Sequence, residues 1–204
     1  MGNTEQIRQL IAQEAARLMY EEGVREYRDA KRKAAHRYSS GKGPVLGACL
    51  PSNAEIHREL QRLLRLYEPE VGPQRLLELR LLALKYMTLL EPFRPYLVGS
   101  VLSGAVSSRS DVDLHLFAES AEEVEDYLRS RGLSFEAELV TVRKGREFKD
   151  YPHLYLQEDG VEIECSVYPP EERHLVSKSS ITGKPMARAD LKKLRGLIAE
   201  QLDA

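Results

Sequence analysis

Two aspartates, Asp111 and Asp113, stand one residue apart at the start of a short apolar run that ends at Phe117. On a β-strand, side chains at positions i and i+2 point to the same face, so the two carboxylates would lie side by side, about 6–7 Å apart at Cα. Like charges that close repel each other unless a cation lies between them. Mg²⁺ takes oxygen ligands and is commonly held by one or two carboxylates and substrate phosphates. The spacing therefore predicts a divalent-metal site.

A Gly-Ser pair, Gly99 and Ser100, follows a second short apolar run over 96–98. A glycine at the end of a strand lets backbone N–H groups approach a phosphate closely, and the start of a helical turn favours an anion. We expect such a turn over 101–105. A phosphate-binding turn beside a metal site is typical of a nucleotide site.

The order of these residues resembles the signature of the DNA-polymerase-β-like nucleotidyltransferase superfamily, particularly its minimal nucleotidyltransferases. Ten residues separate Gly-Ser from Asp-Val-Asp, an apolar run follows, and Gly104 and Ser110 also fall where that pattern has them. The resemblance implies that an NMP unit moves from an NTP to an acceptor hydroxyl on a protein, an RNA or a small molecule, with release of pyrophosphate. ATP is the first candidate for the NTP, and the implied cofactor is Mg²⁺ or Mn²⁺.

The resemblance also implies site residues on other segments. Family members carry a third acidic residue, flanked by apolar ones, on a later strand; Glu164 between Ile163 and Cys165 matches that pattern best, and Glu162 on the same strand face is the alternative. The implied catalytic and metal-binding residues are Asp111, Asp113 and Glu164. The implied nucleotide-binding residues are Gly99, Ser100 and Ser110, and Lys184 and Arg188 are further candidates from a later loop.

The chain departs from the pattern directly after Gly99-Ser100, where many members carry arginines and this chain has Val101 and Ser103. Lys184 or Arg188, in and after a polar loop that begins at Glu171, could replace them, because loops on a rigid scaffold often carry binding residues. A surface cluster of cations at the start of a helix is the alternative interpretation of that loop.

Two further functions stay open at this stage. The first is an antitoxin-like role, since minimal nucleotidyltransferases often act beside a helical toxin partner, so a protein partner is possible. The second is a degenerate nucleotide-binding module, which binds a nucleotide but has lost catalytic turnover together with the arginines.

The elements that position these residues are predicted from hydrophobic periodicity. Strands are expected over 96–98, 114–117, 135–142, 153–157 and 161–168, and Asp159-Gly160 is a strong signal for a hairpin between the last two. The expected helices cover 4–22, 24–38, 53–67, 74–90 and 120–131, with one more from Arg188 onward. This order predicts an α+β fold with a nucleotidyltransferase-like, mixed, twisted sheet of about four to five strands and flanking helices.

The chain of 204 residues is expected to form a helical N-terminal region over 1–72 and a nucleotidyltransferase-like domain over 73–204. Lys and Arg number 30 against 32 Asp and Glu, a balance that argues against bulk nucleic-acid binding. The helix over 24–38 is nevertheless basic, and either a contact to a nucleic acid or an acidic partner, or a solvated face balanced by Glu26 and Asp29, explains it.

The two cysteines, Cys49 and Cys165, are far apart and favour neither a disulfide framework nor a zinc site. The first residues are polar, and no run of eighteen apolar residues occurs. We therefore expect a cytoplasmic protein without a membrane partner.

Overall fold

The computed structural model describes residues 2–24, 26–38, 49–68, 71–144, 147–175 and 178–203, and the chain divides into two compact units. The helical unit comprises Met1–Pro69 and Ser179–Lys184, and the sheet unit comprises Glu70–Lys178 and Pro185–Ala204. The sequence places the boundary after residue 72 and keeps 73–204 together. In the structure Ser179–Lys184 instead closes into a turn, with Ser179 N–H donating to the Lys184 carbonyl, and clusters with the helical unit.

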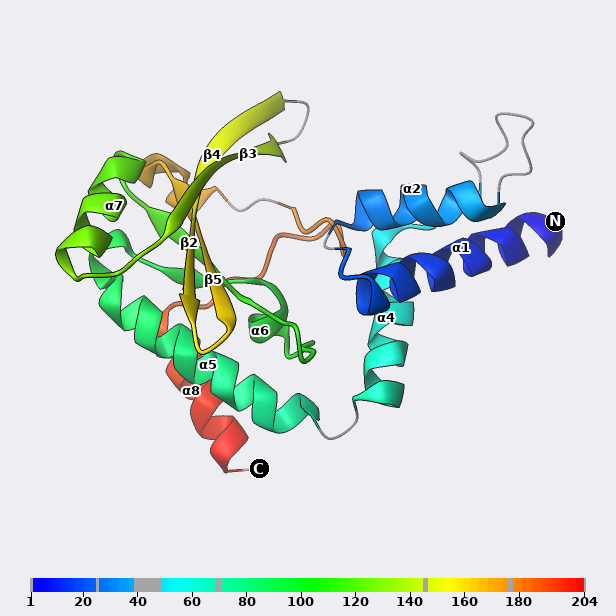
Figure 1. The fold of residues 1–204 in the computed structure, drawn as a ribbon, viewed down its shortest axis with the longest axis horizontal. Coiled ribbons are helices and arrows are strands. Elements are labelled where there is room, and N and C mark those ends of the chain that lie inside the picture. Colours follow the sequence, from blue (N-terminus) through cyan, green and yellow to red (C-terminus); the bar gives the residue numbers. More distant parts are fainter. Residues whose placement is uncertain are drawn as a thin grey trace. The chain divides into compact units, whose positions relative to one another are not determined.

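The helical unit is built from amphipathic helices that bury one face each (Figure 1). These are α1 (Gly2–Glu21), α2 (Tyr27–Tyr38) and α4 (Asn53–Tyr67). Small residues of α1 and α2, including Ala15, Ala16 and Ala34, are fully buried and let the two helices approach closely. Ser52 caps α4, because its hydroxyl accepts from Glu55 N–H while the Glu55 carboxylate accepts from Ser52 N–H.

The sheet unit contains a five-stranded sheet in the order β1-β2-β5-β4-β3. Its strands are β1 (Tyr96–Leu97), β2 (Val112–Phe117), β3 (Glu136–Lys144), β4 (Glu147–Glu158) and β5 (Val161–Tyr168). β2 and β5 run parallel, and the other neighbouring strands run antiparallel. The predicted α+β class with a mixed sheet is thus confirmed.

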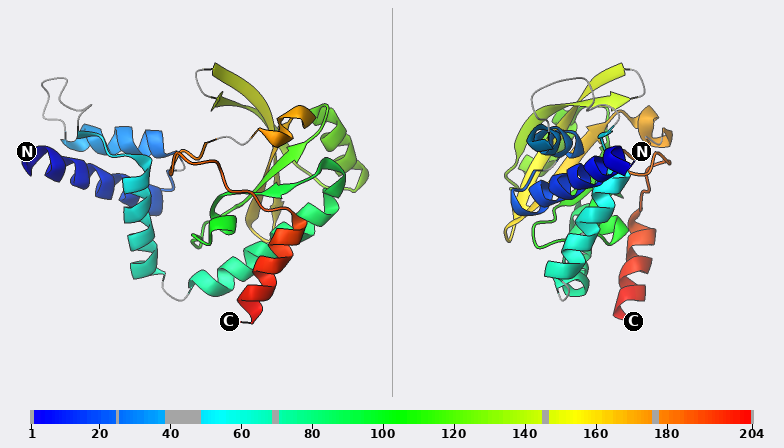
Figure 2. Two further views of the ribbon diagram at one scale, coloured as in Figure 1. Left: turned by 180° about the vertical axis from the view of Figure 1, so that it is seen from behind. Right: turned by 90° about the vertical axis from the view of Figure 1, so that its right-hand side faces the viewer.

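Helices cover the apolar face of this sheet (Figure 2). They are α5 (Val71–Leu89), α7 (Ala121–Ser130) and α8 (Leu191–Leu202); the short helices are η1 (Glu91–Phe93), α6 (Gly99–Ser103) and η2 (Pro170–His174). Val112, Leu114 and Leu116 of β2 point into this core and are fully buried. The alternate residues of β2 therefore face the other side of the sheet, here called the polar face.

Several element boundaries differ from the sequence prediction, and two of them bear on the site. β4 begins at Glu147 rather than at 153, because its first half pairs with β3 in a solvent-exposed part of the hairpin where apolar alternation is absent. α8 begins at Leu191, capped by the Asp190 carboxylate, so Arg188 precedes the helix. Among the described residues, none of the helices is both long enough and apolar enough to span a bilayer.

Candidate functional site

Asp113 and Glu164 occupy the same level of the sheet, directly opposite each other on the parallel strands β2 and β5. Neighbouring strands lie about 4.8 Å apart, so the two side chains emerge side by side on the polar face. Both residues are half-buried. The structure therefore brings together two of the three carboxylates that the sequence assigns to the site. The third, Asp111, is also half-buried and precedes the first residue of β2.

Gly99 lies against the Asp113 carboxylate. A Cβ atom placed on Gly99 would stand 1.9 Å from Oδ2 of Asp113, and Gly99 has a φ of +70°, a region that residues with side chains rarely adopt. Val98 N–H also donates to the Asp113 carbonyl over 3.0 Å. Only glycine fits at this position, so the Gly-Ser turn and the carboxylate form one local structure.

Ser100 and Ser110 have different environments. The Ser100 hydroxyl oxygen is buried and, within the described part of the chain, has no hydrogen-bond partner. The Ser110 hydroxyl accepts from Ser107 N–H over 2.9 Å, so it tightens the loop between α6 and β2. Ser100 therefore has an unused hydrogen-bonding group next to Gly99, whereas Ser110 shapes the chain before Asp111.

Arg80 of α5 holds the Gly99-Ser100 turn through hydrogen bonds to the chain that follows it. Its guanidinium donates to the Val101 carbonyl over 3.4 Å, to the Leu197 carbonyl over 3.3 Å and to Gln201 Oε1 over 2.9 Å. The side chain is buried, which lowers the pKa of Arg80. Arg80 thus ties α6 to α5 and α8 and holds the Gly-Ser turn in place.

His153 of β4 contacts Glu164, and it is not among the site residues predicted from the sequence. Its Nδ1 lies 2.7 Å from Oε1 of Glu164, and the His153 side chain is 8% exposed. The predicted hairpin contains the signal for this contact. A two-residue Asp159-Gly160 turn places Tyr155 opposite Glu164, and His153, two residues before Tyr155, lies on the same face of the sheet. Glu162, the alternative third carboxylate, accepts from Gln157 instead.

The other end of the polar face is aromatic. Phe117, four residues beyond Asp113 on β2, has its ring centroid 6.0 Å from that of Tyr96 and 6.0 Å from that of Tyr168. The Arg188 guanidinium lies 5.7 Å from the Phe117 centroid and donates to the carbonyls of Arg173 and Leu175. Burial lowers the pKa of Arg188.

Arg188 therefore holds the 173–175 segment at the aromatic end, about 13 Å along β2 from Asp113. Lys184 is exposed and belongs to the helical unit, so it is not part of the site as described for the sheet unit. Lys184 and Arg188 are the two cations that could replace the absent arginines. The contacts within the sheet unit place neither of them beside Asp113 and Glu164.

The described residues contain no group of three or more His, Cys, Asp or Glu side chains arranged to hold a metal ion. A Mg²⁺ ion does not need such a group, because it commonly keeps waters and binds one or two carboxylates together with substrate phosphates. Asp113, with Asp111 two residues before it, fits that pattern of binding. No family model matches the chain, and neither a curated protein nor a solved structure matches it.

Proposed function

We propose that the chain is a metal-dependent nucleotidyltransferase that moves an NMP unit from an NTP, ATP being the first candidate, to an acceptor hydroxyl. The observation that carries the proposal is the contact between Gly99 and Asp113, with Glu164 beside them. The contact joins the two halves of the sequence signature, the Gly-Ser turn and the aspartates. A nucleotidyltransferase-like fold is part of the same proposal, supported by the mixed sheet in which these residues lie.

The residues would divide the work as follows. Asp111 and Asp113 would hold Mg²⁺, which when bound neutralises phosphate charge. The backbone N–H groups near Gly99 would approach the triphosphate, and the Ser100 hydroxyl would donate to one of its oxygens. Glu164 lies on the far side of Asp113 from the Gly-Ser turn, which suits the acceptor hydroxyl rather than the triphosphate.

The test is binding and turnover by two neutral variants, Asp111→Asn and Asp113→Asn. With Mg²⁺ and each of the four NTPs, we expect wild-type protein to bind a nucleotide and to release pyrophosphate in the presence of cell extract. Either substitution should weaken binding at least tenfold and change the melting temperature by no more than about 2 °C, because removing one of two like charges relieves repulsion.

Asp126→Asn is the matched control, since Asp126 is an exposed aspartate on α7 that pairs with Arg129. It should bind and turn over like wild type. The proposal is wrong if wild-type protein binds no nucleotide with Mg²⁺, and the aspartates are structural if either substitution strongly destabilises the fold.

A nucleotide-binding module without turnover is the second candidate. Val101, where many family members carry an arginine, is fully buried in the core, and Arg188 donates to backbone carbonyls. Neither position therefore supplies a cation to the triphosphate. Binding of an NTP without release of pyrophosphate or labelling of any acceptor would favour this candidate.

A further inference from the structure

His153 is a buried histidine with one ring nitrogen engaged and the other without a partner. Nδ1 lies 2.7 Å from Oε1 of Glu164, whereas Nε2 is buried and has no hydrogen-bond partner within the described part of the chain. The His153 side chain is 8% exposed. Buried polar atoms are nearly always hydrogen-bonded, so an exception beside a candidate site needs an explanation.

The hydrogen-bond partner of Nδ1 determines whether Nε2 is a donor or an acceptor. A carboxylate can only accept, so Nδ1 must carry the hydrogen in the contact with Glu164. In a neutral imidazole the other nitrogen then has a lone pair and accepts. The atom left without a partner is therefore an acceptor, and the group that would satisfy it is a donor such as a hydroxyl.

We propose that Glu164 and His153 act as a pair, in which Glu164 orients the imidazole and Nε2 of His153 accepts a hydrogen bond from the hydroxyl that attacks the nucleotide. The inference rests on the proposed nucleotidyl transfer and names the residue that receives the acceptor. It places the acceptor hydroxyl on the β4 side of Glu164, two strands from β2, where Asp113 lies (Figure 1).

The step that this pair serves is a displacement at the α-phosphorus. The acceptor oxygen, held by its hydrogen bond to Nε2, forms a bond to the α-phosphorus while the bond from that phosphorus to the bridging oxygen breaks. Pyrophosphate leaves with the electron pair of the broken bond. The hydroxyl proton passes along the hydrogen bond to Nε2 and then to water, and Glu164 keeps Nδ1–H in place throughout.

Two substitutions of His153 test the roles of Nδ1 and Nε2 one at a time. The carboxamide of asparagine reaches about as far as Nδ1, so His153→Asn keeps a donor for Glu164 and has no group at the position of Nε2. The longer glutamine in His153→Gln reaches the Nε2 position and offers no donor near Nδ1. His174→Asn, at an exposed histidine of η2, is the control.

The assay uses ATP with Mg²⁺ and water as the acceptor hydroxyl, and it follows the release of AMP and pyrophosphate. We expect His153→Asn to bind Mg·ATP within about twofold of wild type and to release AMP at least tenfold more slowly. His153→Gln should also be slow, and His174→Asn should match wild type. Full turnover by His153→Asn would overturn the proposal, because it would show that nothing at Nε2 is needed.

A second measurement does not depend on turnover. Side-chain ¹⁵N spectra of the full-length protein should contain one histidine with hydrogen on Nδ1 and none on Nε2, and that signal should be absent from His153→Asn and displaced in Glu164→Gln. Hydrogen on Nε2 instead would overturn the pair. Wild-type protein that shows the expected spectrum and binds no Mg·ATP would contradict the nucleotidyltransferase proposal and leave the arrangement of the pair established.

Discussion

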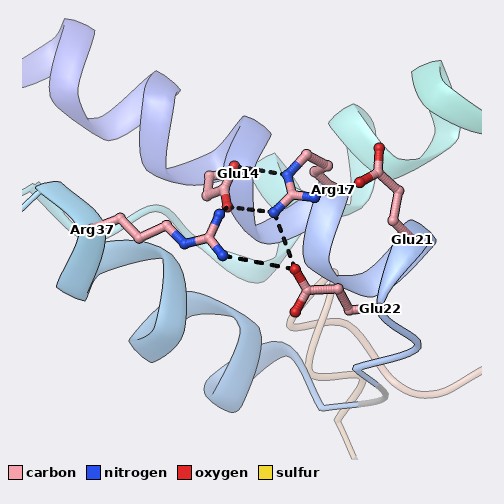
Figure 3. A network of polar contacts seen from close by, with 5 residues as sticks. All are labelled: Glu14, Arg17, Glu21, Glu22 and Arg37. Atoms are coloured by element: carbon pink, nitrogen blue, oxygen red, sulfur yellow. Dashed lines mark hydrogen bonds and ion pairs between the residues drawn. The ribbon is translucent and has the colours of Figure 1, made fainter.

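The helical unit and the candidate site of the sheet unit differ in how their charges are arranged. In the helical unit, charges of opposite sign meet within and across helices: Arg8 bonds to Glu55 over 2.8 Å, and Glu14 accepts from both Arg17 and Arg37 (Figure 3). At the candidate site, carboxylates stand at neighbouring positions, with Asp113 opposite Glu164 and Asp111 just before the strand, although elsewhere the sheet unit also has pairs of opposite sign such as Lys85 with Glu158.

This difference distinguishes ion pairs that support the fold from neighbouring carboxylates that a bound cation would stabilise. Pairs of opposite sign contribute modestly to stability, whereas carboxylates held side by side repel each other. Arrangements that cost stability are found where a ligand is bound. In α2, Arg32 pairs with Asp29 and Arg37 with Glu14, so part of the basic helix predicted over 24–38 is balanced within the helical unit.

Gly99→Ala should have the largest effect, because it forces an atom into the space of the Asp113 carboxylate. The added Cβ would stand 1.9 Å from Oδ2, at a φ of +70°. We expect a loss of about 2–5 kcal/mol in the free energy of unfolding, from backbone strain and overpacking together, and loss of Mg·ATP binding. Urea unfolding and calorimetric titration measure the two effects.

Gly104→Ala is the matched control. Gly104 also has a positive φ, of +81°, but the nearest atom to an added Cβ is a Leu76 methyl carbon at 3.7 Å. It should cost about 1 kcal/mol, from backbone strain alone, and leave binding intact. Equal effects of the two substitutions would mean that the contact with Asp113 has no special role.

Glu55→Gln should remove an acid-sensitive part of the stability of the helical unit. The Arg8 guanidinium lowers the pKa of Glu55 to about 2. Because the folded-state pKa lies below the unfolded value of about 4.3, this contribution is fully present above pH 5 and is lost as the pH falls through about 2. Arg8 is 35% exposed, so solvent screening reduces the contribution to about 1 kcal/mol.

Urea unfolding of both proteins at pH 6 and pH 2 measures this contribution. Glutamine keeps the capping contacts at this position of α4, so the substitution isolates the charge. We expect wild type to be more stable than Glu55→Gln by about 1 kcal/mol at pH 6 and by much less at pH 2. A difference that does not change with pH would show that the ion pair contributes nothing.

The local parts of the fold could be predicted from the sequence, whereas the site depends on a pairing that could not. Asp159 and Gly160 form the expected hairpin turn, with φ values of +50° and +77°, because that pair tolerates this backbone conformation. The parallel pairing of β2 with β5 joins residues 51 positions apart in the chain, Asp113 and Glu164, and no short-range signal sets its register.

The same distinction applies to the cations of the site. Arg188 and Lys184 are close in the sequence and were equivalent candidates on composition, yet the structure assigns them to different units. Arg188 is fixed by two backbone carbonyls that only the folded η2 segment presents. The sequence shows which residue types could bind a phosphate. Whether such a side chain already bonds to another part of the protein depends on the tertiary structure.

Arg37→Ala should have the smallest effect, although Arg37 joins two glutamates in Figure 3. The Arg37 side chain is 54% exposed, and Arg17 continues to donate to Glu14 when Arg37 is removed. We expect a loss below about 0.5 kcal/mol in urea unfolding at low salt, and less at high salt. Glu14→Gln should cost more, because the Glu14 side chain is only 13% exposed and serves both arginines. If Arg37→Ala costs as much as Glu14→Gln, the charges of the helical unit act as one cooperative network, and its stability cannot be treated as a sum of separate pairs.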